Sequence, residues 1–223
     1  MELIYTSIDF IIHIDKHLNA IMQSWGAWSY LLLFMIVFAE TGLLVTPFLP
    51  GDSLLFAAGS FAALGAFNIT YLCIALILAA VIGDSVNYAV GSYFGERLFR
   101  KPNSRIFRKE YLDRTHAFYE KYGGKTIVLA RFVPIIRTFA PFVAGAGKMS
   151  YAYFFTYNVA GGILWVAVFV LGGFWLGNVP IVKKNFTLVI FIIIFVSILP
   201  GVVEYWKHRM RSGAAARQAK KPA

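Results

Sequence analysis

The segment from Ala130 to Pro141 most constrains what this chain can fold into. Its sequence, ARFVPIIRTFAP, is apolar and aromatic except for Arg131, Arg137 and one threonine. Pro134 and Pro141 predict that no unbroken helix runs through it. An arginine at the centre of a bilayer costs about 2.5–3.5 kcal/mol, and broken backbone at membrane depth is tolerated only beside protein or water. If the segment lies in a membrane, we therefore expect it to line a polar cavity that suits an anion.

The composition indicates an integral membrane protein. Of the 223 residues, 59% are hydrophobic and the mean hydropathy is +0.66, whereas soluble domains are about 45–50% apolar. The formal net charge is +10, and 15 of the 21 Lys and Arg residues lie in two blocks, 97–125 and 207–221. Such blocks beside apolar runs are typical of cytoplasmic segments, so they indicate topology and argue against nucleic acid as a partner.

The N-terminal residues 3–24 predict an amphipathic helix at the membrane interface. Apolar and polar positions alternate there with helical spacing, and the stretch is too polar to span a bilayer. It lacks the basic start and cleavage site of a signal peptide. His13 and His17 are spaced to share a metal, but no third ligand lies beside them. We therefore predict no metal site and no cofactor.

The next apolar segment predicts a broken helical hairpin. The run 27–45 is apolar apart from Glu40, and a break rich in Pro and Gly follows at 46–52. A second helix is expected from Ser53 to about Leu64, with Asp52 as its cap. Neither piece reaches the roughly 20 residues that a spanning helix needs. A re-entrant hairpin with Glu40 and Asp52 near its tip is the economical interpretation.

The remaining apolar segments repeat this plan. Tyr71–Phe94 predicts a spanning helix that contains Asp84, and 126–147 predicts a second broken hairpin. Tyr151–Leu176 and 186–203 predict two further spanning helices. Two spans then lie between the basic blocks, which places both blocks, and the C-terminus, on the cytoplasmic side.

The two halves of the chain resemble each other. A slide of 91 residues lays Glu40 on Arg131, and a slide of 82 lays Gly91–Gly95 on Gly173–Gly177. Each half is a broken hairpin followed by a spanning helix, and the second half is expected to run opposite to the first. Interrupted apolar segments in two inverted halves point to the binding site of a transporter.

The charges in the hairpins predict what the site binds. Arg131 and Arg137 offer planar forks that can clamp a phosphate group. Glu40 and Asp52 can carry protons, because a carboxyl group withdrawn from water binds protons more readily. We expect the four side chains to share one cavity if the hairpin tips meet. The alternative, static ion pairs that hold the hairpins together, is disfavoured because buried pairs are rarely strong net stabilisers.

Asp84 and Asn158 are possible secondary site residues. Each can serve the site or can simply satisfy broken hairpin backbone, and the sequence leaves both interpretations open. Enzyme motifs are missing from the sequence, including a nucleophile elbow, a zinc-ligand helix and a phosphate-binding glycine loop. The four histidines, at 13, 17, 116 and 208, lie outside the proposed core. We therefore predict no catalytic residues, and a protein that is not an enzyme.

Several motifs together resemble the DedA family of bacterial inner-membrane proteins, within the SNARE-associated (VTT) superfamily. The resemblance covers about residues 2–210. Its motifs are FAETG at 38–42, FLPGDS at 48–53, RFVPIIR at 131–137, Pro141 with Ala144-Gly145, and Asn158-x-x-Gly161-x-x-x-Trp165. The resemblance implies two opposed re-entrant hairpins plus spanning helices. It also implies that Glu40, Asp52, Arg131 and Arg137 match the essential acids and bases of the family.

The resemblance implies an organisation and a location. The chain is expected to be an all-α integral membrane protein with two inverted repeats, in the bacterial cell inner membrane, multi-pass, with a cytoplasmic C-terminus. The expected single membrane domain covers 1–211. Its parts are a first repeat at 27–96, a cytoplasmic basic segment at 97–125, a second repeat at 126–178 and a last transmembrane helix at 186–206. A basic tail at 207–223 overlaps the end of the domain.

The resemblance also implies a function. The family is associated with envelope integrity, cell division, proton-motive-force dependence and resistance to cationic antimicrobials. Members are implicated in recycling undecaprenyl phosphate, and distant eukaryotic relatives behave as phospholipid scramblases. We predict a proton-motive-force-linked transporter or flippase of an anionic lipid, undecaprenyl phosphate or a phospholipid. Alternatives are a proton-coupled antiporter of small ions or drugs, a scramblase and a membrane scaffold without transport. A homo-oligomer is left open.

Overall fold

The computed structural model describes residues 25–43, 51–99 and 123–184, and every regular element within these ranges is helical. The predicted all-α fold class is confirmed for this part of the chain. The predictions for the amphipathic helix at 3–24, most of the basic segment, the last span at 186–206 and the tail at 207–223 lie outside the described residues.

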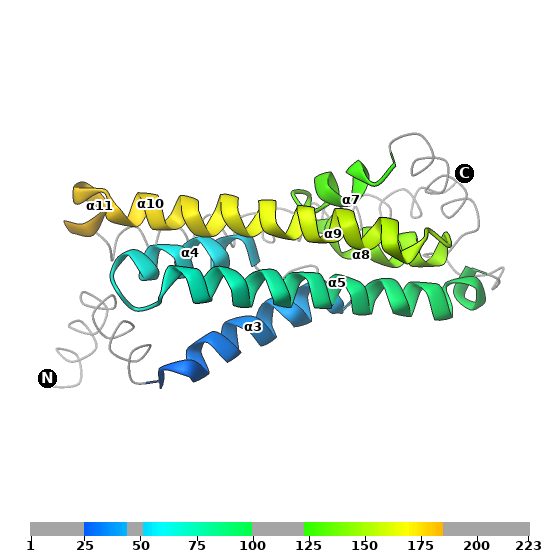
Figure 1. Cartoon of the computed structure of the whole chain (residues 1–223), viewed down its shortest axis with the longest axis horizontal. Coiled ribbons are helices and arrows are strands. Elements are labelled where there is room, and N and C mark those ends of the chain that lie inside the picture. The colour runs from blue at the N-terminus through cyan, green and yellow to red at the C-terminus, as the bar shows by residue number, and fades with distance from the viewer. Residues whose placement is uncertain (1–24, 44–50, 100–122, 185–223) are drawn as a thin grey trace, which may run out of the picture.

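Two long helical stretches form the frame of the molecule. The first is α5 (Ile69–Phe99), and the second joins α9 (Tyr151–Val166), the π-helical turn η1 (Ala167–Leu171) and α10 (Gly172–Asn178), with the short α11 (Pro180–Lys184) following. Residues 69–94 and 151–178 are long and apolar enough to cross a membrane, which agrees with both predicted spans. The two stretches run antiparallel and side by side (Figure 1).

The first predicted hairpin consists of two short helices. α3 (Ala27–Gly42) has 16 residues and α4 (Gly51–Ala63) has 13, so neither is long enough to span a bilayer alone. The prediction that Asp52 caps α4 is wrong. Asp52 lies inside the first turn of the helix, and its carboxylate bonds to side chains of other helices instead.

The second predicted hairpin consists of α7 (Lys125–Ala130) and α8 (Pro134–Ala146). Pro134 begins α8, where its fixed φ and missing N–H cost nothing. The prediction that Pro141 also breaks the segment is wrong, because Pro141 lies inside α8. A proline in a helix interior costs about 3 kcal/mol. The extensive packing of α8 along α5 opposes this cost and keeps the helix continuous.

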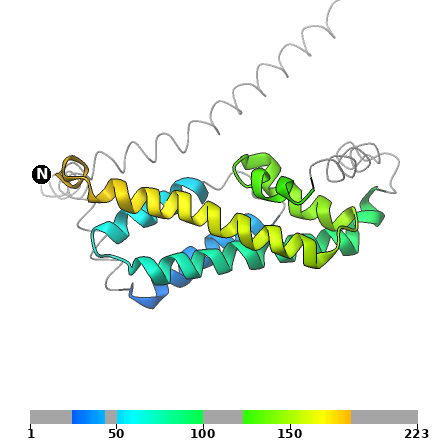
Figure 2. The ribbon, with the colours of Figure 1, turned by 45° about the horizontal axis from the view of Figure 1, so that its top comes forward.

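Each hairpin packs on both long stretches. We call the two helices of a hairpin its first and second arm. The first arm of each hairpin packs on the long stretch of its own half of the chain, α3 on α5 and α7 on α9. The second arms cross over, so that α4 packs on η1 and α10 while α8 packs on α5. The α3–α4 pair therefore lies towards one end of the frame and the α7–α8 pair towards the other, as Figures 1 and 2 show.

Glycines permit the close approach of the crossed arms. At each contact a Cβ atom would run into a backbone carbonyl of the facing helix, which cannot move as a flexible side chain can. The glycines and the residues that carry these carbonyls are Gly59 with Val170, Gly173 with Phe56, Gly91 with Phe142 and Gly145 with Tyr88.

The outer surface of the frame is apolar, and its interior holds charged and amide side chains among apolar ones. On α5, Ile74, Leu78 and Ile82 are exposed, whereas Asp84 and Asn87 are almost completely buried. This is the reverse of a soluble helix, which turns its apolar stripe inward. It fits a helix whose outer face meets lipid and whose inner face meets polar groups.

Candidate functional site

Arg137 joins the two hairpins through two carboxylates. Its Nη2 donates to Oε1 of Glu40, near the end of α3, and its Nη1 donates to Oδ1 of Asp52, in the first turn of α4, at 2.8 Å. The side chains of Arg137 and Glu40 are only 4% exposed, whereas that of Asp52 is 31% exposed. The structure thus brings together three of the four predicted site residues.

Two further groups complete this set, which we call the Arg137 centre. The backbone N–H of Gly51 donates to Oε1 of Glu40 at 3.1 Å. Trp165 donates its indole N–H to Oδ1 of Asp52 at 2.8 Å, and its ring centroid lies 4.6 Å from Cζ of Arg137. An arginine at this distance from an aromatic ring makes a cation–π contact. Both carboxylates are therefore held by a donor in addition to the arginine.

Arg131 belongs to a second set, the Arg131 centre. It lies at the break between α7 and α8, and its Nη2 donates to Oδ2 of Asp84 at 2.6 Å and to Oδ1 of Asn158. The amide of Asn158 in turn donates to the carbonyl of Val81 at 3.0 Å. Both secondary residues of the sequence interpretation therefore bind an arginine, and neither amide nor carboxylate caps hairpin backbone.

Direct contacts do not join all four charged residues, and the expectation that they share one cavity stays a prediction. Among the described residues, no hydrogen bond or ion pair joins Arg131 to Glu40, Asp52 or Arg137. Arg131 hydrogen-bonds to side chains of α5 and α9, whereas Arg137 pairs with carboxylates of α3 and α4. The sequence repeat aligned Glu40 with Arg131 and could not reveal that Asp84 is the carboxylate that Arg131 contacts.

Asn87 ties both hairpins to α5, and sequence reasoning assigned it no role in the site. Its amide nitrogen donates to the carbonyl of Thr41 at 3.1 Å and to that of Thr138 at 2.8 Å. The residue is completely buried. Its signal in the sequence was its position three residues after Asp84 on a predicted spanning helix, which places both side chains on one helix face.

The two centres together contain an odd number of charges. Two guanidinium groups, of Arg131 and Arg137, face three carboxyl groups, of Glu40, Asp52 and Asp84. With every group ionised the set carries one excess negative charge, which one proton neutralises. Within the described part of the chain, Nε of each arginine and Nη1 of Arg131 are buried without a hydrogen-bond partner. Both arginines thus retain donors for a further anionic ligand.

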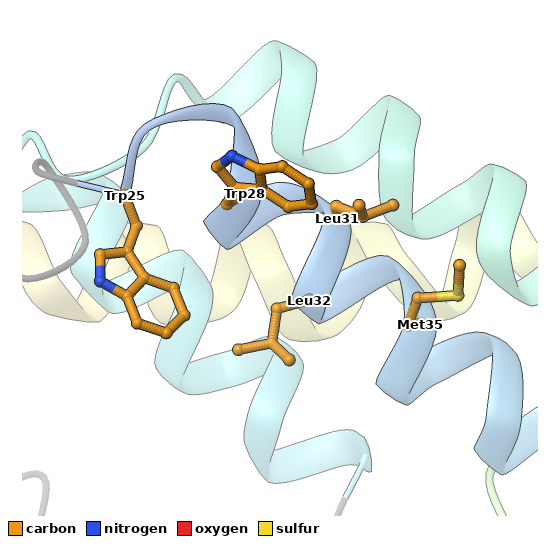
Figure 3. A pocket seen from close by; sticks show the side chains of 5 residues that line it. All are labelled: Trp25, Trp28, Leu31, Leu32 and Met35. Carbon is orange, nitrogen blue, oxygen red and sulfur yellow. The ribbon is translucent and has the colours of Figure 1, made fainter.

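An apolar hollow lies on the first half of α3, towards the end opposite Glu40. Its volume is about 540 Å³, and the side chains that line it are Trp25, Trp28, Leu31, Leu32 and Met35 (Figure 3). Among the described residues no charged side chain lines it, so these five side chains offer a phosphate group no partner. We place the candidate anion site at the two arginine centres and not in this hollow.

The fold and these centres define a helical membrane protein that buries arginine–carboxylate pairs among its hairpins and its long helices. Comparison with known proteins agrees with this class. The model of the VTT domain family matches residues 49–174. No solved structure matches the chain.

Named relatives cover most or all of the chain. It is 57% identical over 222 residues to protein DedA of Escherichia coli K12, which covers 99% of this chain and 100% of that protein. It is 46% identical over 178 residues to an uncharacterized membrane protein of Mycobacterium leprae, 80% and 79% of the two chains. It is 34% identical over 155 residues to inner membrane protein YqjA of Escherichia coli, 70% of each chain.

The chain belongs to the DedA family of VTT-domain membrane proteins. The resemblance inferred from the motifs around Glu40, Asp52, Arg131 and Arg137 is thereby confirmed. The names of these relatives also support an inner-membrane location for the chain.

Proposed function

We propose that the protein is a proton-motive-force-linked transporter or flippase of a lipid phosphate. Undecaprenyl phosphate is the substrate that the family resemblance favours, and its recycling for envelope biogenesis is the proposed role. The observation that carries the proposal is the Arg137 centre, where one buried arginine is shared by carboxylates from the two arms of a hairpin. Such an arginine is a phosphate ligand whose partners can be exchanged.

Exchange of partners links anion binding to proton uptake. A phosphate group that binds the two terminal nitrogens of Arg137 replaces Glu40, Asp52 or both, because these carboxylates occupy them. A carboxylate that loses its buried cationic partner costs several kcal/mol if it stays ionised. It therefore takes up a proton as the phosphate binds and releases it when the phosphate leaves. The excess of one carboxyl group over the arginines supports this cycle.

Arg131 is proposed as the second phosphate ligand. Its Nε and Nη1 are buried without a partner among the described residues, and a phosphate oxygen accepts strongly from such donors. Asp84 is then the carboxylate that the phosphate displaces from Arg131, as it displaces Glu40 or Asp52 from Arg137. The exposed apolar faces of the frame leave the lipid tail in the bilayer while the head group enters the protein.

The two hairpins are proposed as inverted, re-entrant repeats that open to opposite sides of the membrane. Phe56 and Gly59 in α4 occur 86 residues before Phe142 and Gly145 in α8. In the crossed contacts these two pairs of residues face Gly173 and Val170 in one case, and Gly91 and Tyr88 in the other. Gly91 and Tyr88 occur 82 residues before Gly173 and Val170. Two equivalent contacts with constant offsets support a repeat, and inverted repeats support alternating access.

Transport by purified protein in liposomes of defined lipids tests the proposal. We expect Arg131→Ala with Arg137→Ala to abolish undecaprenyl phosphate movement. Because Ala leaves buried carboxylates unpaired, Arg137→Lys is the milder variant that keeps the charge and loses the fork. It should slow transport about ten- to hundredfold, since a charge-assisted hydrogen bond contributes about 1.5–3 kcal/mol.

The control for this series is Lys125→Ala, an exposed cation at the start of α7. It should transport at the parent rate. Parent-rate transport by the folded double Ala variant would refute the arginine clamp. Transport of small ions without lipid phosphate by the parent protein would instead identify an antiporter.

Proton coupling is tested at Glu40. The rate of the parent should fall when the pH gradient is collapsed, and the rate of Glu40→Gln should not depend on the gradient, because glutamine cannot bind the proton. Glu110→Gln, in the basic segment 97–125, serves as the control and should keep the parent dependence. A Glu40→Gln protein that still depends on the gradient would assign the proton to another residue.

A further inference from the structure

Trp165 is the one neutral side chain in the Arg137 centre that contacts both charges of an ion pair. It is completely buried in α9, directly before the last residue of that helix. Its indole N–H and Nη1 of Arg137 donate to the same oxygen, Oδ1 of Asp52, and each bond is 2.8 Å long. The indole ring also lies against the guanidinium, 4.6 Å from Cζ.

Asp52 is the member of the centre that depends most on such a donor. Its side chain is 31% exposed, while those of Arg137 and Glu40 are 4% exposed. Water can therefore compete for Asp52 more readily than for Glu40, which Gly51 also holds. Arg137 of α8 and Glu40 of α3 are the charged groups that face Asp52 among the described residues. Without Trp165, Arg137 would be the only described side chain that donates to Asp52.

We propose that Trp165 is a positioning residue that keeps Asp52 on Arg137, and so sets how readily an anionic head group displaces this carboxylate. The inference rests on the proposed function for its effect on substrate, and on geometry alone for its effect on Asp52. A phosphate that approaches Nη1 of Arg137 competes with a carboxylate held by two donors. The indole N–H therefore opposes the binding of the phosphate to Arg137, and it raises the concentration of substrate at which the site is half-occupied.

The backbone next to Trp165 links it to the helix that carries Asp52. The π-helical turn η1 begins two residues after Trp165 and packs against α4. Single π-helical turns are rare and occur often at functional sites. A movement of α4 along η1 would change the separation of Trp165 and Asp52, and would thereby release Arg137.

The bond between Trp165 and Asp52 can be observed without transport. Protein labelled with ¹⁵N at its tryptophan indoles gives one N–H resonance for each tryptophan, and Trp165→Phe identifies the resonance of Trp165. We expect Asp52→Asn to shift that resonance upfield, because a neutral amide accepts more weakly than a carboxylate. It should leave the resonance of the exposed Trp175 in place. A Trp165 resonance that does not respond to Asp52→Asn would overturn the inference.

The effect on substrate is measured in the liposome assay. Trp165→Phe keeps a ring against Arg137 and removes only the donor. We expect its KM for the lipid phosphate to fall about tenfold or more, since one hydrogen bond to a charged group is lost, with a smaller change in maximal rate.

The matched control is Trp175→Phe in α10, whose side chain is 71% exposed. It should keep the KM and the maximal rate of the parent. Parent values in Trp165→Phe would show that Trp165 only packs, and would overturn the substrate effect. If the parent protein moves no lipid phosphate, the proposed function fails, and the indole resonances still decide whether Trp165 positions Asp52.

Discussion

Asn87 shows how one side chain can bind a helix of each hairpin at once. Thr41 lies in the last turn of α3 and Thr138 in the first half of α8, and both present a carbonyl to the Asn87 amide. The last four carbonyls of a helix have no N–H partner within that helix, and the carbonyl of Thr41 is one of them. At membrane depth water cannot replace such a donor, so a buried amide on the spanning helix does so.

We therefore expect Asn87→Leu to destabilise the protein by about 2–4 kcal/mol, because two carbonyls lose a buried donor that links α3 and α8 to α5. Unfolding in detergent with increasing denaturant measures the change in the free energy of unfolding. Asn178→Leu is the control, since its exposed amide bonds, within the described part of the chain, only to the carbonyl of Phe174 in its own helix. Equal effects at Asn87 and Asn178 would contradict the role of Asn87 as a link between hairpins.

At the scale of the elements, the crossed arms depend on backbone approaching backbone. α4 meets α10 and α8 meets α5 at glycines that face carbonyl oxygens. Helices in membranes gain little from hydrophobic exclusion, so close packing through small residues is a main source of their association. These contacts hold Asp52 and Arg137 at the distance at which they pair.

Gly172 and Gly173 provide a matched pair of substitutions for this contact. A Cβ at Gly173 would overlap the backbone carbonyl of Phe56, whereas one at Gly172 would lie 3.8 Å from the side chain of Phe56, an ordinary contact. We expect Gly173→Ala to destabilise by about 1–3 kcal/mol through overpacking. Gly172→Ala should be neutral or stabilise by up to about 1 kcal/mol, because alanine favours the helix.

The same unfolding measurement separates the two variants. In addition, Gly173→Ala should slow transport if α4 shifts Asp52 away from Arg137, whereas Gly172→Ala should transport at the parent rate. Two variants of equal stability would show that α4 and α10 approach less closely than the structure indicates.

At the scale of the whole molecule, the antiparallel frame makes a prediction about topology. The connection between α4 and α5 and that between α8 and α9 lie at opposite ends of the frame (Figure 1). Thr70, in the first turn of α5, and Ser150, directly before α9, are both exposed there. If the halves are inverted repeats across a membrane, these two residues face opposite compartments.

Single cysteines at these positions test the arrangement. In a Cys73→Ala background, which removes the only cysteine of the chain, an impermeant maleimide should label Thr70→Cys and Ser150→Cys from opposite sides of the inner membrane. Labelling of right-side-out vesicles reports the residues on one side of the membrane, and labelling of inverted vesicles reports those on the other. Labelling of both from one side would refute the inverted topology, whatever the outcome of the transport assays.

The sequence by itself determined the membrane class, the family and the elements that local chemistry controls. Chain length and hydropathy predicted both long helices, and Pro134 with the break at 46–52 predicted two hairpins, because proline and glycine act on their own turn. The same local argument failed at Pro141, where packing of α8 on α5 overrides it. The sequence also selected Glu40, Asp52 and Arg137, since charge in an apolar segment is conspicuous.

Only the tertiary structure decided which charges meet. The repeat aligned Glu40 with Arg131, yet Arg131 pairs with Asp84 and Asn158, and Glu40 pairs with Arg137. Which charged residues pair depends on which arm crosses to which long helix. Contacts between residues far apart in the chain cannot be predicted from the local sequence pattern. Trp165 entered the site for the same reason, because the approach of α4 brings Asp52 to its indole nitrogen.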